Sequence, residues 1–182
     1  MNRMSNQNDL NFLATLAKSF FKQAHIKKTL AAIKEEEITG WEKWLQIEFA
    51  TFLRSHDSVK EWNREIQHPL DKRIAKSRSA CAIDFVILQK HKHSNLALEI
   101  KQRSSMTACL RGMLRDIKKV GKIKEKQFNS RGIWCLGVHD HASREDVVRE
   151  VVYYSSLHKV ATQEQHVISE PIGKTGFSFT LL

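Results

Sequence analysis

Two acidic residues lie inside stretches of sequence that are otherwise apolar. Asp84 interrupts the run SACAIDFVIL at 79–88, and Glu99 interrupts the run NLALEIKQ at 95–102. Burying an ionised carboxylate costs free energy unless a cation or several hydrogen-bond donors compensate it. Lys101 follows Glu99 by two positions, so in a β-strand the two side chains point to the same face.

These three residues could form a site for a divalent cation. If the strands at 79–88 and 95–102 are neighbours, Asp84 lies beside Glu99 across the ladder. Two carboxylates beside one ammonium suit a hard cation, with the lysine placed where it can act on a water molecule. The alternative, which stays open here, is that each acid is a buried structural residue paired with Lys101 or with an arginine.

A third carboxylate comes from the segment 40–56, whose spacing predicts a helix. Glu48 has Trp44 one turn before it and Phe52 one turn after it, so we expect it to point toward the core. Glu42 is the competing candidate, and its phase places it nearer the polar side of the helix. The pattern does not decide between the two glutamates.

The positive charge of the chain is concentrated downstream of Lys101. The net charge is +10, and the 31 residues from Lys101 to Arg131 hold ten basic and two acidic side chains, or +8 of that total. Basic residues recur at helical spacing on one face of the segment after Thr107: Arg111, Arg115, Lys118, Lys119, Lys122 and Lys126. An ordinary solvated helix face mixes signs, so we expect this face to contact the phosphates of a nucleic acid.

The elements that position these residues follow from hydrophobic spacing and capping residues. We expect a helix from Leu10 with Asp9 as its cap, running on to about 33, and a second helix over 40–56 capped by Thr39. The segment 59–78 fits either a helix or a strand. Further elements are the strands 79–88 and 95–102 joined by a short hairpin, a helix from Thr107, a strand at 132–139, a helix after the capping box of Ser143 and Asp146, and one or two edge strands in the tail.

Together these elements predict an α/β fold with a central mixed β-sheet flanked by helices. We expect one domain over 1–182, made of an N-terminal helical extension (1–38), a core (39–157) and C-terminal strands (158–182). The sequence His139-Asp140-His141 is interpreted as a loop with surface histidines, and Trp134 as a core residue.

Composition excludes several classes of protein. Apolar residues make up 41% and there are only 7 Gly and 2 Pro, which excludes disordered and low-complexity chains. We see no apolar run long enough for a membrane helix and no signal peptide, so we expect no membrane partner. The odd count of cysteines (Cys81, Cys109, Cys135) without CxxC spacing favours a reducing, cytoplasmic compartment.

The spacing of Asp84, fourteen further residues and Glu99-Ile100-Lys101 resembles the PD-(D/E)xK superfamily of metal-dependent phosphodiesterases. The resemblance spans about 39–157 and includes the order of elements. The Pro of the motif is absent, because Ala82-Ile83 precede Asp84.

The resemblance implies a restriction-endonuclease-like core (αβββαβ) with an extra N-terminal helix. It also implies a Mg²⁺-dependent endonuclease, with Mn²⁺ as a substitute, acting on nucleic acid and first of all on double-stranded DNA. Asp84, Glu99 and the Ile100 carbonyl would hold the metal, Glu48 would hold a second metal or its water shell, and Lys101 would orient or help to deprotonate water. Contacts with nucleic acid would come from Arg111, Arg115, Lys118, Lys119 and Lys122.

Three matters stay open at this stage. Cutting both strands of a duplex with one site per chain favours a homodimer, whose surface could include the helix at 10–33. A non-cleaving nucleic-acid-binding module of the same fold and a partner-dependent interaction protein are the alternative functions. DNA versus RNA, strand form, recognition sequence and biological pathway are not disclosed by the residues.

Overall fold

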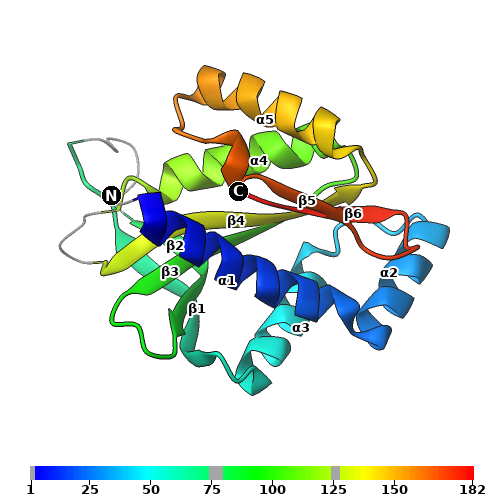
Figure 1. Ribbon diagram of the computed structural model, residues 1–182, viewed down its shortest axis with the longest axis horizontal. Helices are drawn as coiled ribbons and strands as arrows, with labels where there is room; N and C mark the ends of the chain where they lie inside the picture. The colour runs from blue at the N-terminus through cyan, green and yellow to red at the C-terminus, as the bar shows by residue number, and fades with distance from the viewer. Residues whose placement is uncertain (1–2, 74–79, 124–127) are drawn as a thin grey trace.

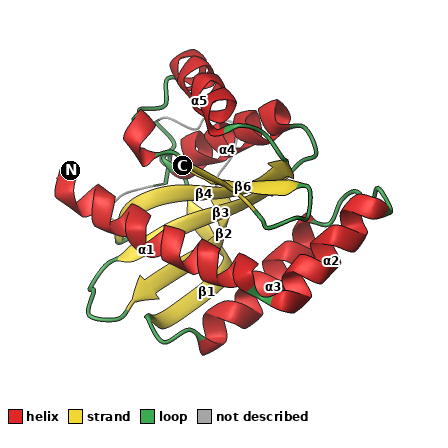
Figure 2. Cartoon of the chain, turned by 45° about the vertical axis from the view of Figure 1, so that its right-hand side comes forward, coloured by secondary structure: helices red, strands yellow, loops and turns green. Residues whose placement is uncertain are grey.

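A computed structural model describes residues 3–73, 80–123 and 128–182 of the chain. It is an α/β structure in which a six-stranded mixed sheet is covered by helices on both faces (Figures 1 and 2). The elements are α1 (Arg3–Lys22), α2 (Ala24–Glu35), α3 (Glu42–Ser55), β1 (Val59–Pro69), β2 (Ala80–Gln89), β3 (Asn95–Gln102), α4 (Met106–Val120), β4 (Ser130–Asp140), α5 (Arg144–His158), a 3-10 turn (Glu164–His166), β5 (Ile168–Pro171) and β6 (Phe177–Leu181).

The strand order in the sheet is β1-β2-β3-β4-β6-β5. One neighbouring pair, β3 and β4, is parallel, and α4 makes the crossover between these two strands. The other neighbouring strands are antiparallel. The prediction of a mixed sheet flanked by helices is therefore confirmed.

One face of the sheet packs against α1, α2 and α3. Its core includes Phe20 of α1, Leu30 of α2, Phe49 of α3 and Phe85 of β2, each at most 1% exposed. The apolar stripes of α1 and α2 are thus used inside the molecule, and both helices belong to the same core as the sheet. Burial of this kind stabilises a fold by roughly 25 cal/mol per Å² of apolar surface.

The opposite face packs against α4, with α5 outside it (Figure 2). Cys109 and Met113 of α4, Cys135 of β4 and Val147 of α5 are completely buried in this second core. Helix α4 begins after Ser105, whose hydroxyl accepts a hydrogen bond from the Ala108 N–H, and α5 begins after Ser143, whose hydroxyl accepts one from the Asp146 N–H. The helix start predicted at Ser143 is confirmed, and the Asp146 carboxylate accepts a hydrogen bond from the Ser143 hydroxyl at 2.8 Å.

The structure corrects three expectations in the N-terminal half. Asp9 is not a helix cap, because α1 already begins at Arg3 and Asp9 is buried in its interior. The helix does not run unbroken to 33, since Gln23 is extended and separates α1 from α2. Thr39 does not cap the next helix, which starts at Glu42 after Trp41.

The ambiguous segment and the tail are resolved as strands. Residues 59–69 form the edge strand β1 and pair with β2; of the rest of the segment, 74–78 lie outside the described residues. In the tail, β5 is an edge strand as expected, whereas β6 is an interior strand between β4 and β5 with every residue buried. The three cysteines are buried and free. No helix in the described parts of the chain has the length and apolar character needed to cross a membrane.

Candidate carboxylate–lysine site

Asp84 and Glu99 meet where β2 and β3 stop pairing. The last paired residues are Phe85 and Leu98, so the register places Asp84 opposite Glu99 one step further on. At this point the ladder is replaced by a side-chain contact, because the Asp84 carboxylate accepts a hydrogen bond from the Ile100 N–H at 2.8 Å. The predicted juxtaposition of the two acidic positions is confirmed.

Glu99 is the more deeply buried of the two acids, at 3% exposed. Its cationic neighbour is Lys119 of α4, whose Nζ lies 3.4 Å from Oε1 and 3.5 Å from Oε2 of the carboxylate. Oε1 has no hydrogen-bond partner among the described residues, although it is buried. The ion pair is therefore loose, and the carboxylate keeps unused acceptor capacity.

Lys101 is held by carboxylates from two helices. Its Nζ lies 3.0 Å from Oδ2 of Asp116 on α4 and 3.6 Å from Oε2 of Glu42 on α3. Gly112 of α4 makes room for this side chain, since a Cβ at that position would lie 3.1 Å from the Lys101 Cδ. The Asp116 carboxylate also contacts Lys119 at 3.6 Å, which links the two lysines.

The helical glutamate at this site is Glu42 and not Glu48. Glu42 accepts a hydrogen bond from the Gln102 N–H at 2.9 Å, directly after Lys101. Glu48 instead pairs with His25 of α2 at 3.4 Å. The reason is helix phase: the buried face of α3 includes Leu45, Gln46, Phe49, Ala50 and Leu53, and Glu42 lies one turn before this face begins. The prediction that Glu48 joins the other acids is wrong.

The group formed by Glu42, Asp84, Glu99, Asp116, Lys101 and Lys119 is called here the carboxylate–lysine cluster. Burial, together with the negative charge of Asp84, raises the pKa of Glu99 to about 8. Burial also raises the pKa of Asp84, against the opposing effects of the Ile100 N–H and Lys101. The two cations move in the complementary direction: burial disfavours their charge, but the carboxylates outweigh it and raise the pKa of Lys101 and of Lys119.

The chemistry of this cluster fits a hard divalent cation in part. The side-chain atoms that could coordinate a metal are all carboxylate oxygens, and one of them, Glu99 Oε1, is buried without a hydrogen-bond partner among the described residues. Mg²⁺ usually takes one or two carboxylates and completes its shell with water and substrate phosphate, which Asp84, Glu99 and the Ile100 carbonyl could accommodate. Among residues 3–73, 80–123 and 128–182, however, no three His, Cys, Asp or Glu side chains converge closely enough to hold a metal by themselves. The lysines occupy the space between the acids.

The predicted basic face of α4 divides into two parts. Arg111 and Arg115 are exposed, with the Arg111 guanidinium 5.3 Å from the centre of the Tyr154 ring, and Lys118 donates to the His158 carbonyl at 3.0 Å. Lys119 turns inward to the cluster, and Lys122 is half-buried. Lys126 lies outside the described residues.

The exposed part of the basic face continues into the cluster. A small cavity of about 90 Å³ is lined by Lys101, Arg103, Ala108, Gly112, Arg115 and Asp116. Three of these six residues are cationic, and Asp116 is the one acid among them. This excess of positive over negative side chains in the lining favours a phosphate-like anion in the cavity.

One residue of the site, Asp116, was not selected from the sequence, and one residue outside the site, His139, was misjudged. Asp116 stood out there only as one of two acids in a basic stretch, and its spacing from Gly112 (four) and Lys119 (three) puts all three on one helix face. His139 was also misjudged: it is completely buried, and its Nε2 lies 2.8 Å from the Thr180 hydroxyl, so it is a core residue and not part of a surface loop.

Comparison of the chain with models of protein families, with curated proteins and with solved structures finds no match to any of them.

Proposed function

We propose that this protein is a metal-dependent nuclease that hydrolyses phosphodiester bonds, most readily in double-stranded DNA. The observation that carries the proposal is the meeting of Asp84, Glu99 and Lys101 at the end of β3, beside a helix whose exposed face is basic. Hydrolysis of a phosphodiester builds negative charge on the phosphate and on the leaving oxygen, and such a site can stabilise both.

The order of elements supports kinship with the PD-(D/E)xK superfamily. Helix α3, strands β1 to β3, helix α4 and strand β4 follow one another as in the proposed αβββαβ restriction-endonuclease-like core. Asp84 lies at the splayed end of the β2–β3 pair, and the ExK motif occupies the last residues of β3. We propose that α1 and α2 are additions to this core.

Asp84, Glu99 and the carbonyl of Ile100 would hold Mg²⁺ or Mn²⁺, with Glu42 in place of Glu48 as the helical glutamate. A bound ion of this kind supplies Lewis acidity and lowers the pKa of a water ligand. Glu99 must give up its proton to join this set, because its pKa is about 8. Lys119 must also yield its contact with Glu99, so ion binding and rearrangement of Lys119 are coupled.

Lys101 would act as a cation and not as a base. Asp116 and Glu42 raise its pKa, so its ammonium has no lone pair with which to take a proton from water. Its role is to orient the attacking water and to balance the charge that develops on the phosphate. Arg103 and Arg115, which line the cavity beside Lys101, would bind the same phosphate or the next one along the strand.

Cleavage assays with matched lysine variants test this proposal. Labelled duplex DNA, single-stranded DNA and RNA are incubated with wild type, Lys101→Ala and Lys174→Ala, in Mg²⁺, Mn²⁺ and EDTA. We expect metal-dependent cleavage by wild type and by Lys174→Ala, whose lysine is exposed on the β5–β6 turn. Lys101→Ala should cleave about 10²- to 10⁴-fold more slowly while still shifting DNA in a gel. Equal rates for both lysine variants would reject the proposal.

A second candidate is a nucleic-acid-binding protein that does not cleave. It is favoured by two observations: both lysines are already paired with acids of the cluster, and no three metal-ligating side chains converge among the described residues. Salt-sensitive gel shifts without cleavage in any metal, combined with no heat of Mg²⁺ binding, would select this candidate. Light scattering of the protein on DNA would show in either case whether it binds as a homodimer.

A further inference from the structure

A cavity of about 250 Å³ lies away from the carboxylate–lysine cluster, at the edge of β4 that faces β6 and not β3. Strand β6 pairs with β4 from Leu136 to Asp140, and Leu182 extends this pairing to Cys135. Before Cys135, β4 has no strand on this side among the described residues, and the segment 160–167 covers the edge instead. The lining is mainly apolar: Ile117, Gly132, Ile133, Trp134, Val160, Ala161, Thr162, Gln163, His166, Val167 and Leu182.

The wall of this cavity contains an unsatisfied hydrogen-bond donor. Trp134 is 6% exposed, and its indole N–H is buried without a hydrogen-bond partner in the described parts of the chain. The absence of a side chain at Gly132 leaves room for this nitrogen, because a Cβ at position 132 would lie 2.5 Å from the Trp134 Nε1. A buried donor left unpaired destabilises the fold, so a ligand that offers an oxygen acceptor gains that hydrogen bond at little desolvation cost to the protein.

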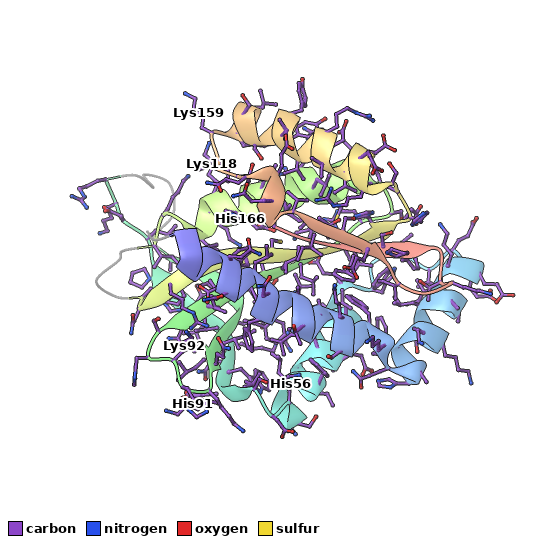
Figure 3. The ribbon with its side chains drawn as sticks, in the orientation of Figure 1. His56, His91, Lys92, Lys118, Lys159 and His166 are labelled. Carbon is purple, nitrogen blue, oxygen red and sulfur yellow. The ribbon has the colours of Figure 1, made fainter. Side chains whose placement is uncertain are left out.

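Two lysines are adjacent in sequence to lining residues of this cavity, although neither lines it. Lys118 follows the lining residue Ile117, Lys159 precedes Val160, and the Lys118 ammonium donates to the carbonyl of His158 at 3.0 Å. The ends of α4 and α5 therefore bring both lysines to one side, and Figure 3 shows them on the same side of the molecule as His166. His166 itself lines the cavity with its ring centre 6.4 Å from that of Trp134.

We infer that this cavity is a binding site for a small aromatic carboxylate. The apolar walls suit one ring system, since the volume is below the roughly 300–1,000 Å³ of sites for drug-sized ligands. A carboxylate oxygen would accept a hydrogen bond from the Trp134 N–H, and its negative charge would be attracted by Lys118 and Lys159, which flank the lining in sequence. The inference does not depend on the proposed nuclease function, because it uses none of the six residues of the cluster.

Intrinsic fluorescence and calorimetry with defined probes test the inference. Benzoate and indole-3-acetate are titrated into the full chain, with benzamide as an uncharged probe of the same shape. We expect saturable binding of the carboxylates with Kd of roughly 0.1–1 mM, accompanied by a change in tryptophan emission, and at least about tenfold weaker binding of benzamide.

Two variants and one control identify the site. Ala161→Phe places a ring in the cavity from its exposed rim and should abolish binding, whereas Ala31→Phe, at an exposed position of α2, should leave Kd unchanged. Trp134→Phe removes the donor and should weaken binding about tenfold and remove the emission change. Carboxylates that bind Ala161→Phe as tightly as wild type, equal affinity for benzamide, or tighter binding of a nucleoside monophosphate than of either carboxylate would overturn the inference.

Discussion

Two buried arrangements of opposite charges in the described parts of the chain are built differently. Asp9 of α1 and Arg131 of β4 form a close pair at 2.7 Å, and the remaining guanidinium nitrogens donate to the Ser94 carbonyl and to the Gln89 side chain. In the carboxylate–lysine cluster, three of the four acids contact the two ammonium groups, and three of the four lysine–acid pairs are 3.4 Å or longer.

The difference separates a structural role from a chemical one. Arg131 joins α1 to the hairpin between β2 and β3, and all three of its nitrogens donate hydrogen bonds, as expected of a residue that fixes tertiary structure. Asp9 Oδ2, like Glu99 Oε1, is buried without a hydrogen-bond partner among the described residues, so the two regions differ in the closeness of the ion pairs and not in this respect. The cluster has more negative than positive groups, and burial, together with the negative charge of Asp84, raises the pKa of Glu99 to about 8. Sites with displaced pKa values and loose pairing are typical of residues that bind ions or move protons.

Breaking the Asp9–Arg131 pair should have the largest effect on stability. Asp9→Ala leaves a buried guanidinium without its carboxylate, and we expect a loss of about 3–5 kcal/mol in the free energy of unfolding by urea. Lys18→Met is the matched control, because Lys18 pairs with Glu170 at the surface and such pairs contribute about 0–1 kcal/mol. A loss for Asp9→Ala no greater than for the control would show that this pair does not anchor α1.

Glu99→Gln should change the free energy of unfolding in the opposite direction to Asp9→Ala, because it should stabilise the protein at high pH. The pKa of Glu99 is about 8 in the folded protein, against an ordinary value of 4.5 that applies to the unfolded chain. The folded protein therefore holds this proton more tightly. Its contribution to stability is present below pH 4.5 and is lost as the pH rises to about 8. Glu99→Gln should therefore flatten the fall in stability between these values and be more stable than wild type at pH 9, by roughly 1–4 kcal/mol.

Urea unfolding at pH 5, 7 and 9 checks this sign. Glu61→Gln makes the same change at an exposed position of β1 and should follow the wild-type pH profile. Addition of Mg²⁺ at pH 9 should stabilise wild type and not Glu99→Gln. A pH profile of stability for Glu99→Gln that runs parallel to that of wild type would mean that the pKa of Glu99 is not raised in the folded protein.

The sequence was sufficient for the strands that carry the site. The segment 95–102 coincides with β3, since an apolar run with an acid and a lysine two apart has few other ways to pack. It was insufficient for β1, because Val59, Trp62 and Ile66 recur at spacings that also suit a helix. Most of β1 is exposed at the edge of the sheet, so burial imposes no clear alternation on it.

The choice between Glu42 and Glu48 failed for a reason of phase. Gln46 is polar but only 2% exposed, because its side-chain oxygen accepts hydrogen bonds from Lys43 and Arg64. Because Gln46 is polar, its position looks like part of the exposed face of α3, although it belongs to the buried face. Glu42, one turn before Gln46, was therefore assigned to the exposed face, and Glu48, six positions later, was chosen instead. Asp9 illustrates the same limit, as its partner Arg131 is 122 residues away.

Lys119→Met tests whether this lysine competes with a divalent cation for Glu99. Its ammonium lies 3.4 Å from the carboxylate, so its loss should strengthen Mg²⁺ binding at pH 9 by about tenfold, or about 1.4 kcal/mol. Lys118→Met is the matched control, since the neighbouring lysine points to the His158 carbonyl instead. Calorimetric titration measures both, and weaker Mg²⁺ binding by Lys119→Met than by the control would assign Lys119 a supporting role.

Gly112→Ala should have the smallest effect on stability and still disturb the site. The new Cβ would lie 3.1 Å from Cδ and 3.3 Å from Cγ of Lys101, so the lysine must shift by a few tenths of an ångström. The gain in helix propensity, about 1 kcal/mol, offsets this crowding, and we expect an unfolding free energy within about 1 kcal/mol of wild type. Because the lysine side chain is displaced, DNA cleavage should fall about tenfold.

Gly121→Ala provides the control on the same helix, because a Cβ there meets the Ile117 carbonyl at 3.3 Å and no residue of the cluster. It should leave cleavage unchanged. If Gly112→Ala also cleaved at the wild-type rate, the exact position of the Lys101 ammonium would not matter to the reaction. The lysine would then resemble Arg131 in having a structural role, and the contrast between the two charged regions would rest on the acids alone.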